Sequence, residues 1–121
     1  MSKPSTFNIR RLALAFTYSC QGLKAAWLNE AAIRQEILAG CFFMPLAFWL
    51  AQSGVELALL LLAMGLVFLA ELTNTAIEFT VDRVGLEKHP LAGQAKDVGS
   101  ALVLSALTLM ALIWTVVIIW R

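Results

Sequence analysis

The sequence predicts an all-α membrane protein in which three transmembrane helices follow an N-terminal amphipathic helix lying in the membrane interface. Of the 121 residues, 60% are hydrophobic and only 14% are charged, and the mean hydropathy is +0.80. A soluble domain of this length has too little interior to bury so much apolar surface. The apolar residues also gather into runs of helical length, separated by short polar segments. We therefore expect a single membrane domain over residues 1–121.

Residues 7–36 are predicted to form the interfacial helix. Apolar side chains recur there at helical spacing and fall within about 80° of one another on a helical wheel. This apolar stripe consists of Leu12, Phe16, Cys20, Leu23 and Trp27. Arg10, Arg11 and Lys24 lie off the stripe, as in helices that bury one face among lipid headgroups. The alternative is an ordinary helix packed on the rest of the protein.

Three apolar runs after this helix are the predicted membrane spans. The first, residues 37–52, is short for a crossing, so we expect it to extend into the preceding helix. A tight turn at residues 52–54 leads to the second span, residues 55–81. The third, residues 98–120, is long enough to cross the bilayer alone. Between the last two spans, residues 82–97 contain glycine, proline and many polar residues, and are predicted to form a loop.

The distribution of basic residues predicts the orientation of the chain in the membrane. The basic residues before the first span are Lys3, Arg10, Arg11, Lys24 and Arg34, and those in the loop are Arg83, Lys88 and Lys96. The turn at 52–56 contains none, and only Arg121 lies at the chain end on that side, so the N-terminus and the loop at 82–97 are expected in the cytoplasm. A net charge of only +1 gives no reason to expect a nucleic-acid partner.

The second span carries a polar stripe at its C-terminal end. Glu71, Asn74, Glu78 and Asp82 fall within about 80° on a helical wheel. Glu71 lies roughly 21–24 Å along the span, near the edge of an apolar core about 30 Å thick, and Glu78 reaches the headgroup layer. An unpaired carboxylate at the depth of Glu71 is costly, so it indicates function. The alternatives are polar contacts between helices for Glu71 and a solvated helix end for Asp82.

Three blocks of sequence resemble the bacterial integral-membrane diacylglycerol kinase family. They are AAWLNEAAIRQE at 25–36, ELTNTAIEFTVDRVG at 71–85 and AKDVGSALVL at 95–104. The resemblance covers nearly the whole chain, and it implies a homotrimer in the bacterial cytoplasmic (inner) membrane, with active sites between subunits. It also implies a kinase that transfers the γ-phosphate of MgATP to diacylglycerol, giving phosphatidic acid and returning diacylglycerol to phospholipid metabolism. The chain lacks the GxxxxGK(S/T) phosphate loop of soluble nucleotide-binding proteins.

The resemblance further implies roles for individual residues. Glu71 would be the general base, Asn74 would order the catalytic cluster, and Glu30 and Glu78 would hold the Mg²⁺ that is bound to ATP. The residues expected to contact the nucleotide are Arg11, Tyr18, Glu30, Glu78, Glu87, His89, Lys96 and Asp97. The residues expected to contact the lipid are Ser19, Arg34, Trp49, Glu71, Ser100 and Trp114. Carboxylate oxygens are ligands that suit Mg²⁺, which agrees with these roles.

Other interpretations of the same residues stay open at this point. Glu30 and Arg34, four residues apart, are also spaced for an ion pair on one helix. Lys96 and Asp97 are also typical of a helix start that is capped by the aspartate. For the whole protein, the wider family includes members that phosphorylate undecaprenol. Hypotheses from other classes are a small oligomeric ion or proton channel lined by Glu71, Asn74 and Glu78, and a membrane assembly or regulatory subunit.

Overall fold

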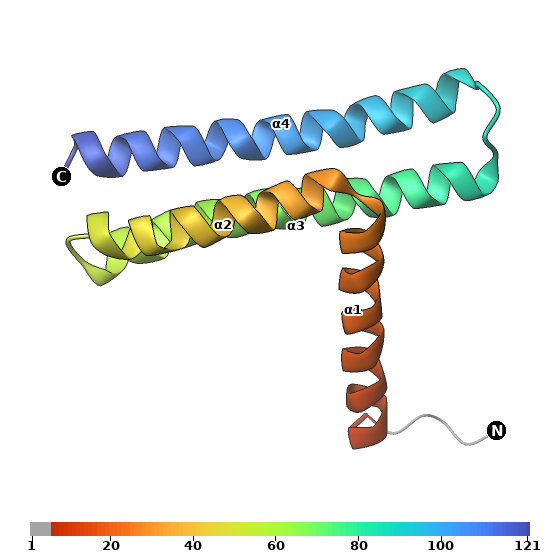
Figure 1. Cartoon of the computed structure of the whole chain (residues 1–121), viewed down its shortest axis with the longest axis horizontal. Helices are drawn as coiled ribbons and strands as arrows, with labels where there is room; N and C mark the ends of the chain where they lie inside the picture. The colour runs from red at the N-terminus through yellow and green to blue at the C-terminus, as the bar shows by residue number, and fades with distance from the viewer. Residues whose placement is uncertain (1–5) are drawn as a thin grey trace.

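A computed structural model describes residues 6–121 as four helices. Helix α1 spans Ile9–Asn29, α2 spans Ala31–Leu50, α3 spans Gly54–Val84 and α4 spans Pro90–Ile119. The last three lie side by side as a bundle, and α1 projects away from the bundle at the start of α2 (Figure 1). Lys3, one of the basic residues used to predict the orientation, lies outside the described residues.

The predicted helix over residues 7–36 is in fact broken at Glu30. The backbone of Glu30 is extended, with φ −122° and ψ 112°, so this residue both ends α1 and begins α2. Arg34 stabilises the corner, because its Nη1 donates hydrogen bonds to the carbonyl oxygens of Trp27 (2.6 Å) and Leu28 (3.4 Å). These are carbonyls of the last turn of α1, which have no partner within the helix. Arg34 therefore caps α1.

The turn between α2 and α3 lies where the sequence predicts it. Ser53 caps α3, because its side chain accepts a hydrogen bond from the backbone N–H of Glu56 at 3.2 Å. The Glu56 carboxylate in turn accepts from the backbone N–H of Gln52 at 2.7 Å. This reciprocal arrangement, similar to a capping box, satisfies backbone donors that the first helical turn leaves free. The tight turn after the first span is therefore confirmed.

The segment 82–97, predicted to be a loop, is mostly helical. Helix α3 continues to Val84 and α4 already begins at Pro90, so only residues 85–89 connect them. Proline suits the first position of a helix, where its missing N–H removes no hydrogen bond. His89 caps the helix, because its Nδ1 accepts from the backbone N–H of Leu91 at 3.1 Å. The predicted helix start at Asp97 is therefore wrong, since Asp97 lies inside α4.

The three bundle helices bury a narrow apolar core and leave most large side chains facing outward. The core at the α2–α3 turn end includes Ala47, Leu60 and Trp114, whose indole N–H donates to the carbonyl of Leu60 at 3.3 Å. Outward-facing side chains such as Phe42 and Leu104 keep 65% and 66% of their surface exposed. Because α2, α3 and α4 are each long and apolar enough to cross a membrane, the prediction of a membrane protein with three candidate spans is confirmed.

Candidate active site

Four polar side chains gather where α1 meets the bundle, and we call Glu30, Glu71, Asn74 and Glu78 the acidic cluster. Glu30 lies at the α1–α2 corner, and the other residues line one face of α3. Measured from Gly54 at 1.5 Å per residue, Glu71 lies about 26 Å along α3 and Asn74 about 30 Å. The 20 residues of α2 span a similar length, about 30 Å, up to Glu30. The acidic cluster therefore lies about one hydrocarbon thickness away from the α2–α3 turn.

The carboxylates of the acidic cluster repel one another across the corner. Glu30 and Glu78 lie within hydrogen-bond reach, although Glu30 lies at the α1–α2 corner and Glu78 lies on α3. Desolvation by burial raises the pKa of Glu30, and the contact with Glu78 and the nearby charges of Glu78, Glu71 and Asp82 raise this pKa further. The proximity of these charges is unfavourable without a cation between them. The negative charge gathered at this site therefore favours the binding of a cation.

Asn74 connects to the acidic cluster through one end of its amide. Its Nδ2 donates a hydrogen bond to the Glu78 carboxylate at 3.3 Å, one helical turn further along α3. Its Oδ1 is buried and, in the described part of the chain, has no hydrogen-bond partner. Buried acceptors without a partner are rare and need a specific explanation. The nitrogen of this amide thus holds Glu78, while its oxygen stays buried without a hydrogen-bond partner.

Glu36 is a further acidic residue near the cluster, and the sequence analysis did not single it out. It lies on α2, close enough to Glu71 for the two charges to interact. Glu36 also lines an apolar groove of about 840 Å³ between α2 and α3, together with residues such as Met44, Phe48, Gly65 and Phe68. The sequence feature that could have identified Glu36 is a carboxylate directly before an apolar run. It was missed because the first span was predicted to begin at residue 37, which placed Glu36 outside it.

A second hollow, of about 580 Å³, lies at the α3–α4 connection and has both apolar and charged side chains in its walls. Glu87 and His89 of the connection line it together with Asp82 and Lys96. Lys96 forms an ion pair with Asp82 at 2.8 Å, in which both side chains stay nearly half exposed. Such an exposed pair contributes little to stability, so Lys96 remains available to another anion. Several of the residues expected to contact a nucleotide therefore share one hollow near Glu78.

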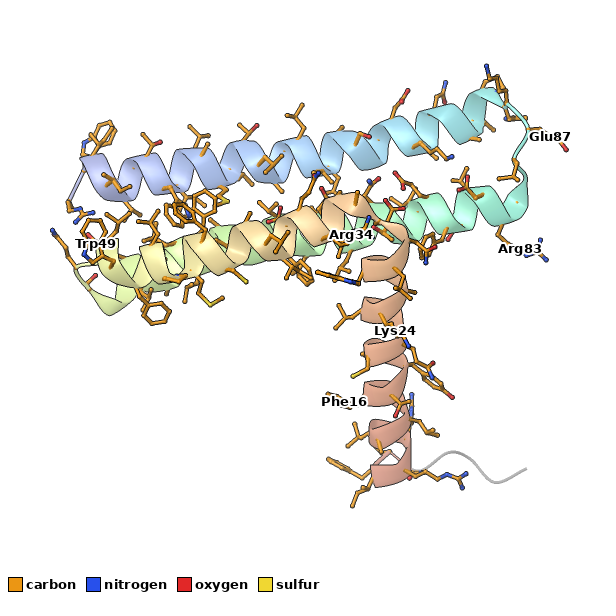
Figure 2. All side chains as sticks on the ribbon, viewed as in Figure 1. Phe16, Lys24, Arg34, Trp49, Arg83 and Glu87 are labelled. Carbon is orange, nitrogen blue, oxygen red and sulfur yellow. The ribbon has the colours of Figure 1, made fainter. Side chains whose placement is uncertain are left out.

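Other residues predicted for the site lie apart from the acidic cluster within this chain. Arg11 and Tyr18 line a separate hollow of about 350 Å³ on α1, which projects away from the bundle. Trp49 lies at the opposite end of the bundle from Glu87 (Figure 2) and is 79% exposed. Trp114 is buried, and Phe43 packs on it with ring centroids 5.5 Å apart. The fold therefore brings only part of the predicted site together.

The remaining predicted residues have mixed placements. Ser19 lines a hollow of about 510 Å³ between α1 and α3. Ser100 is exposed on α4 and directly follows Gly99, which is buried. Arg34 caps α1, and within residues 6–121 the Lys96–Asp82 pair is the one ion pair between side chains, so the proposed Glu30–Arg34 pair does not form. Two of these residues thus lie on surfaces, while the third holds the corner beside Glu30.

The acidic cluster fits a divalent cation that is held only partly by the protein. Among the described residues, no three histidine, cysteine or acidic side chains converge closely enough to hold a metal ion by themselves. Mg²⁺ does not need such a cage, because it typically binds through one or two carboxylates, several waters and the phosphates of a substrate. Glu30 and Glu78 provide two facing carboxylates, and Asn74 holds the second of them through the hydrogen bond that its Nδ2 donates. This donor set suits Mg²⁺ that arrives with a nucleotide.

Comparison with known proteins gives consistent matches over most of the chain. The profile of a family described as prokaryotic diacylglycerol kinase matches residues 17–118. Diacylglycerol kinase of Haemophilus influenzae is 42% identical over 109 residues, which cover 90% of this chain and 92% of that protein. The Escherichia coli enzyme of the same name is 42% identical over 114 residues, covering 94% and 93%. The Pseudomonas aeruginosa enzyme is 42% identical over 120 residues, covering 96% and 98%.

Proposed function

This chain belongs to the prokaryotic diacylglycerol kinase family, and we propose that its acidic cluster transfers the γ-phosphate of MgATP to diacylglycerol at the cytoplasmic membrane interface. The chain is an ATP-dependent lipid kinase, and its product is phosphatidic acid. One observation carries the assignment of the site, namely an acidic cluster whose α3 residues lie about 26–36 Å along this helix, where the apolar core meets the headgroups. A lipid hydroxyl and a water-soluble phosphate donor both have access to this level.

In the proposed site, Glu71 activates the lipid. It is half-buried on α3 and lies on the membrane side of Asn74 and Glu78. In the proposed reaction, the free hydroxyl of diacylglycerol transfers its proton to the Glu71 carboxylate while its oxygen bonds to the γ-phosphorus. The bond between this phosphorus and the bridging oxygen of ADP breaks, and ADP leaves. Such transfers depend on positioning and on charge stabilisation more than on covalent help from the protein.

Glu30, Glu78 and Asn74 form the phosphate side of the proposed site. Glu30 and Glu78 would hold Mg²⁺, and Asn74 keeps the Glu78 carboxylate in place through its 3.3 Å hydrogen bond. When bound with ATP, Mg²⁺ offsets the phosphate charge that the carboxylates would otherwise repel. Lys96 exchanges its exposed partner Asp82 for a phosphate oxygen. The hollow lined by Glu87 and His89 receives the rest of the nucleotide, and Asp97 follows Lys96 on the same helix.

The apolar groove between α2 and α3 is the proposed location of the acyl chains. It starts at Glu36, beside Glu71, and continues along Met44 and Phe48 toward the α2–α3 turn. A lipid hydroxyl at Glu71 would therefore have apolar surface directly below its headgroup. Glu36 is added to the lipid contacts expected from sequence, of which Ser19 and Ser100 remain surface candidates. Arg34 and Trp114 act in this chain as a helix cap and a core residue, and Trp49 lies far from the cluster.

We further propose that the complete site forms in a homotrimer. Arg11 and Tyr18 are expected to contact the nucleotide, but α1 carries them away from the acidic cluster of its own chain (Figure 1). A neighbouring subunit would bring its own cluster to them. The excess of basic residues before α2 and around the α3–α4 connection supports a cytoplasmic location for this face. The membrane would be the bacterial cytoplasmic membrane.

The test of this function is phosphorylation of a defined lipid by the purified protein. Protein in mixed micelles receives radiolabelled MgATP and a short-chain diacylglycerol, and the lipid product is separated and counted. We expect labelled phosphatidic acid that requires Mg²⁺ and disappears with EDTA. Undecaprenol in parallel micelles tests the alternative acceptor. Label in undecaprenyl phosphate but not in phosphatidic acid would refute the proposed acceptor, and absence of label in both would refute the kinase assignment.

A further inference from the structure

Gly99 is the glycine of this chain that has no room for a side chain. It is buried on α4, where α4 packs against α3. A Cβ at this position would overlap with Oδ1 of Asn74 and lie 3.3 Å from Asn74 Cγ. The other glycines of the described chain have open space in the same direction. The restriction at Gly99 therefore comes from one identifiable side chain, that of Asn74.

The contact at Gly99 is specific to Asn74 rather than general to helix packing. The next nearest atom to the position of a Cβ is Ile77 Cδ1 at 3.8 Å, which is an ordinary van der Waals distance. The backbone of α3 is not among the three nearest atoms. Without Asn74, an alanine would fit here. The glycine thus leaves space for a single amide group, whose buried Oδ1 lies against the glycine backbone.

We propose that Gly99 is a positioning residue for the kinase reaction, because its missing side chain lets Asn74 hold Glu78 in the orientation that receives MgATP. The sequence of contacts runs from Gly99 on α4 to Asn74 Oδ1, and from Asn74 Nδ2 to the Glu78 carboxylate at 3.3 Å. A Cβ at Gly99 would turn the Asn74 amide and break this hydrogen bond. The inference rests on the proposed function, in which Glu78 faces the metal and the nucleotide.

The first test uses steady-state kinetics of the full-length protein in mixed micelles. Hydrogen bonds to charged groups contribute about 1.5–3 kcal/mol, which corresponds to roughly a 10- to 150-fold change. We expect Gly99→Ala to lower kcat/KM for MgATP by at least about tenfold, with the KM for diacylglycerol unchanged. Gly54→Ala is the matched control, because Gly54 has open space around it and begins α3 far from the cluster. It should keep parental kinetics.

A double-mutant cycle separates positioning of Asn74 from a general packing defect. If Gly99 acts through Asn74, Gly99→Ala should lower activity strongly in the parent but cause little further loss in Asn74→Ala. Alanine also favours a helix over glycine, so the thermal unfolding midpoint of Gly99→Ala should not fall. Equal losses in both backgrounds would overturn the inference, because Gly99 would then act independently of Asn74. Parental kinetics in Gly99→Ala would overturn it as well.

A second readout needs neither metal nor activity. In metal-free protein in micelles, the side-chain amide of Asn74 gives an NMR signal that is assigned by its absence in Asn74→Ala. This signal should shift in Gly99→Ala and stay in place in Gly54→Ala, and an unchanged signal in Gly99→Ala would overturn the inference.

Parallel kinetics of Glu78→Gln distinguish a failure of the proposed function from a failure of the inference about Gly99. Parental MgATP kinetics in Glu78→Gln would overturn the metal site and this inference with it. A defect in Glu78→Gln with parental Gly99→Ala overturns the inference alone.

Discussion

Replacing Glu71 with glutamine removes the proposed base while keeping the size and polarity of the side chain. Glu71 lies about 26 Å along α3, where the apolar core ends. Its charge interacts with those of Glu36 and Glu78. Glutamine still forms hydrogen bonds at this position, but it does not accept a proton from a lipid hydroxyl. Glu71→Gln therefore tests the chemistry of the site with little change in its shape.

The expected loss follows from the usual contribution of a general base. Such residues accelerate reactions by about 10²–10⁴-fold, which is roughly 3–5 kcal/mol at 1.36 kcal/mol per tenfold change. We expect kcat of Glu71→Gln to fall by this factor. The KM for MgATP should change little, because Glu30 and Glu78 remain in place. The thermal unfolding midpoint should stay the same or rise, because one of several mutually repelling carboxylates is removed.

The assay is steady-state phosphorylation of a short-chain diacylglycerol in mixed micelles, paired with thermal unfolding of the same preparation. Glu56→Gln is a matched control, because it makes the same chemical change about 22 Å away on the same helix. The Glu56 side chain accepts a hydrogen bond from the backbone N–H of Gln52 in the turn before α3, so its replacement should affect stability slightly and leave kcat unchanged. A near-parental kcat in Glu71→Gln would refute its role as base. A loss of activity that follows unfolding or dissociation would instead identify Glu71 as a structural contact between helices.

Three further predictions test the lipid groove, the subunit arrangement and the helix corner. Gly65→Leu places a larger side chain into open space in the α2–α3 groove. This variant should raise the KM for long-chain diacylglycerol more than the KM for short-chain diacylglycerol. Equal changes of the two KM values would contradict binding of the acyl chains in the groove. Inactive Arg11→Gln and Glu78→Gln chains should recover activity when mixed as exchanging subunits, whereas inactivity after verified exchange would place both residues in one chain's site. Arg34→Gln should destabilise the α1–α2 corner by roughly 1.5 kcal/mol, measured as faster amide hydrogen exchange in the last turn of α1, and unchanged exchange would show that the cap is dispensable.

The amino-acid sequence determined those features that depend on a single segment. Apolar runs of membrane-spanning length are visible in the sequence, and the structure forms a helix over each of them. The alignment of Glu71, Asn74 and Glu78 was also predictable, because residues three, four and seven apart share a face of any α-helix. The tight turn at residues 52–54 was predictable as well, and the structure shows that it is stabilised by local capping at Ser53. In each case the feature depends on residues of one continuous segment.

The helix boundaries at Glu30 and Pro90 were harder to predict. No glycine or proline marks the corner at Glu30, and its extended backbone is stabilised by Arg34, which bonds to the end of the preceding helix. A proline such as Pro90 is compatible with two opposite predictions, because proline ends one helix and suits the first position of another. Its position was decided by His89, which caps α4. Boundaries of this kind depend on which backbone groups find partners.

Only the tertiary structure decided which residues of different helices meet. The proximity of Glu30 to Glu78, of Glu36 to Glu71 and of Gly99 to Asn74 depends on how α2 and α4 pack against α3. Helix faces can be predicted from periodicity, but the relative height and rotation of two packed helices are not local properties. The same sequence pattern is compatible with several alignments of α4 along α3. The packed structure selects the one in which the backbone of Gly99 leaves room for the Asn74 amide.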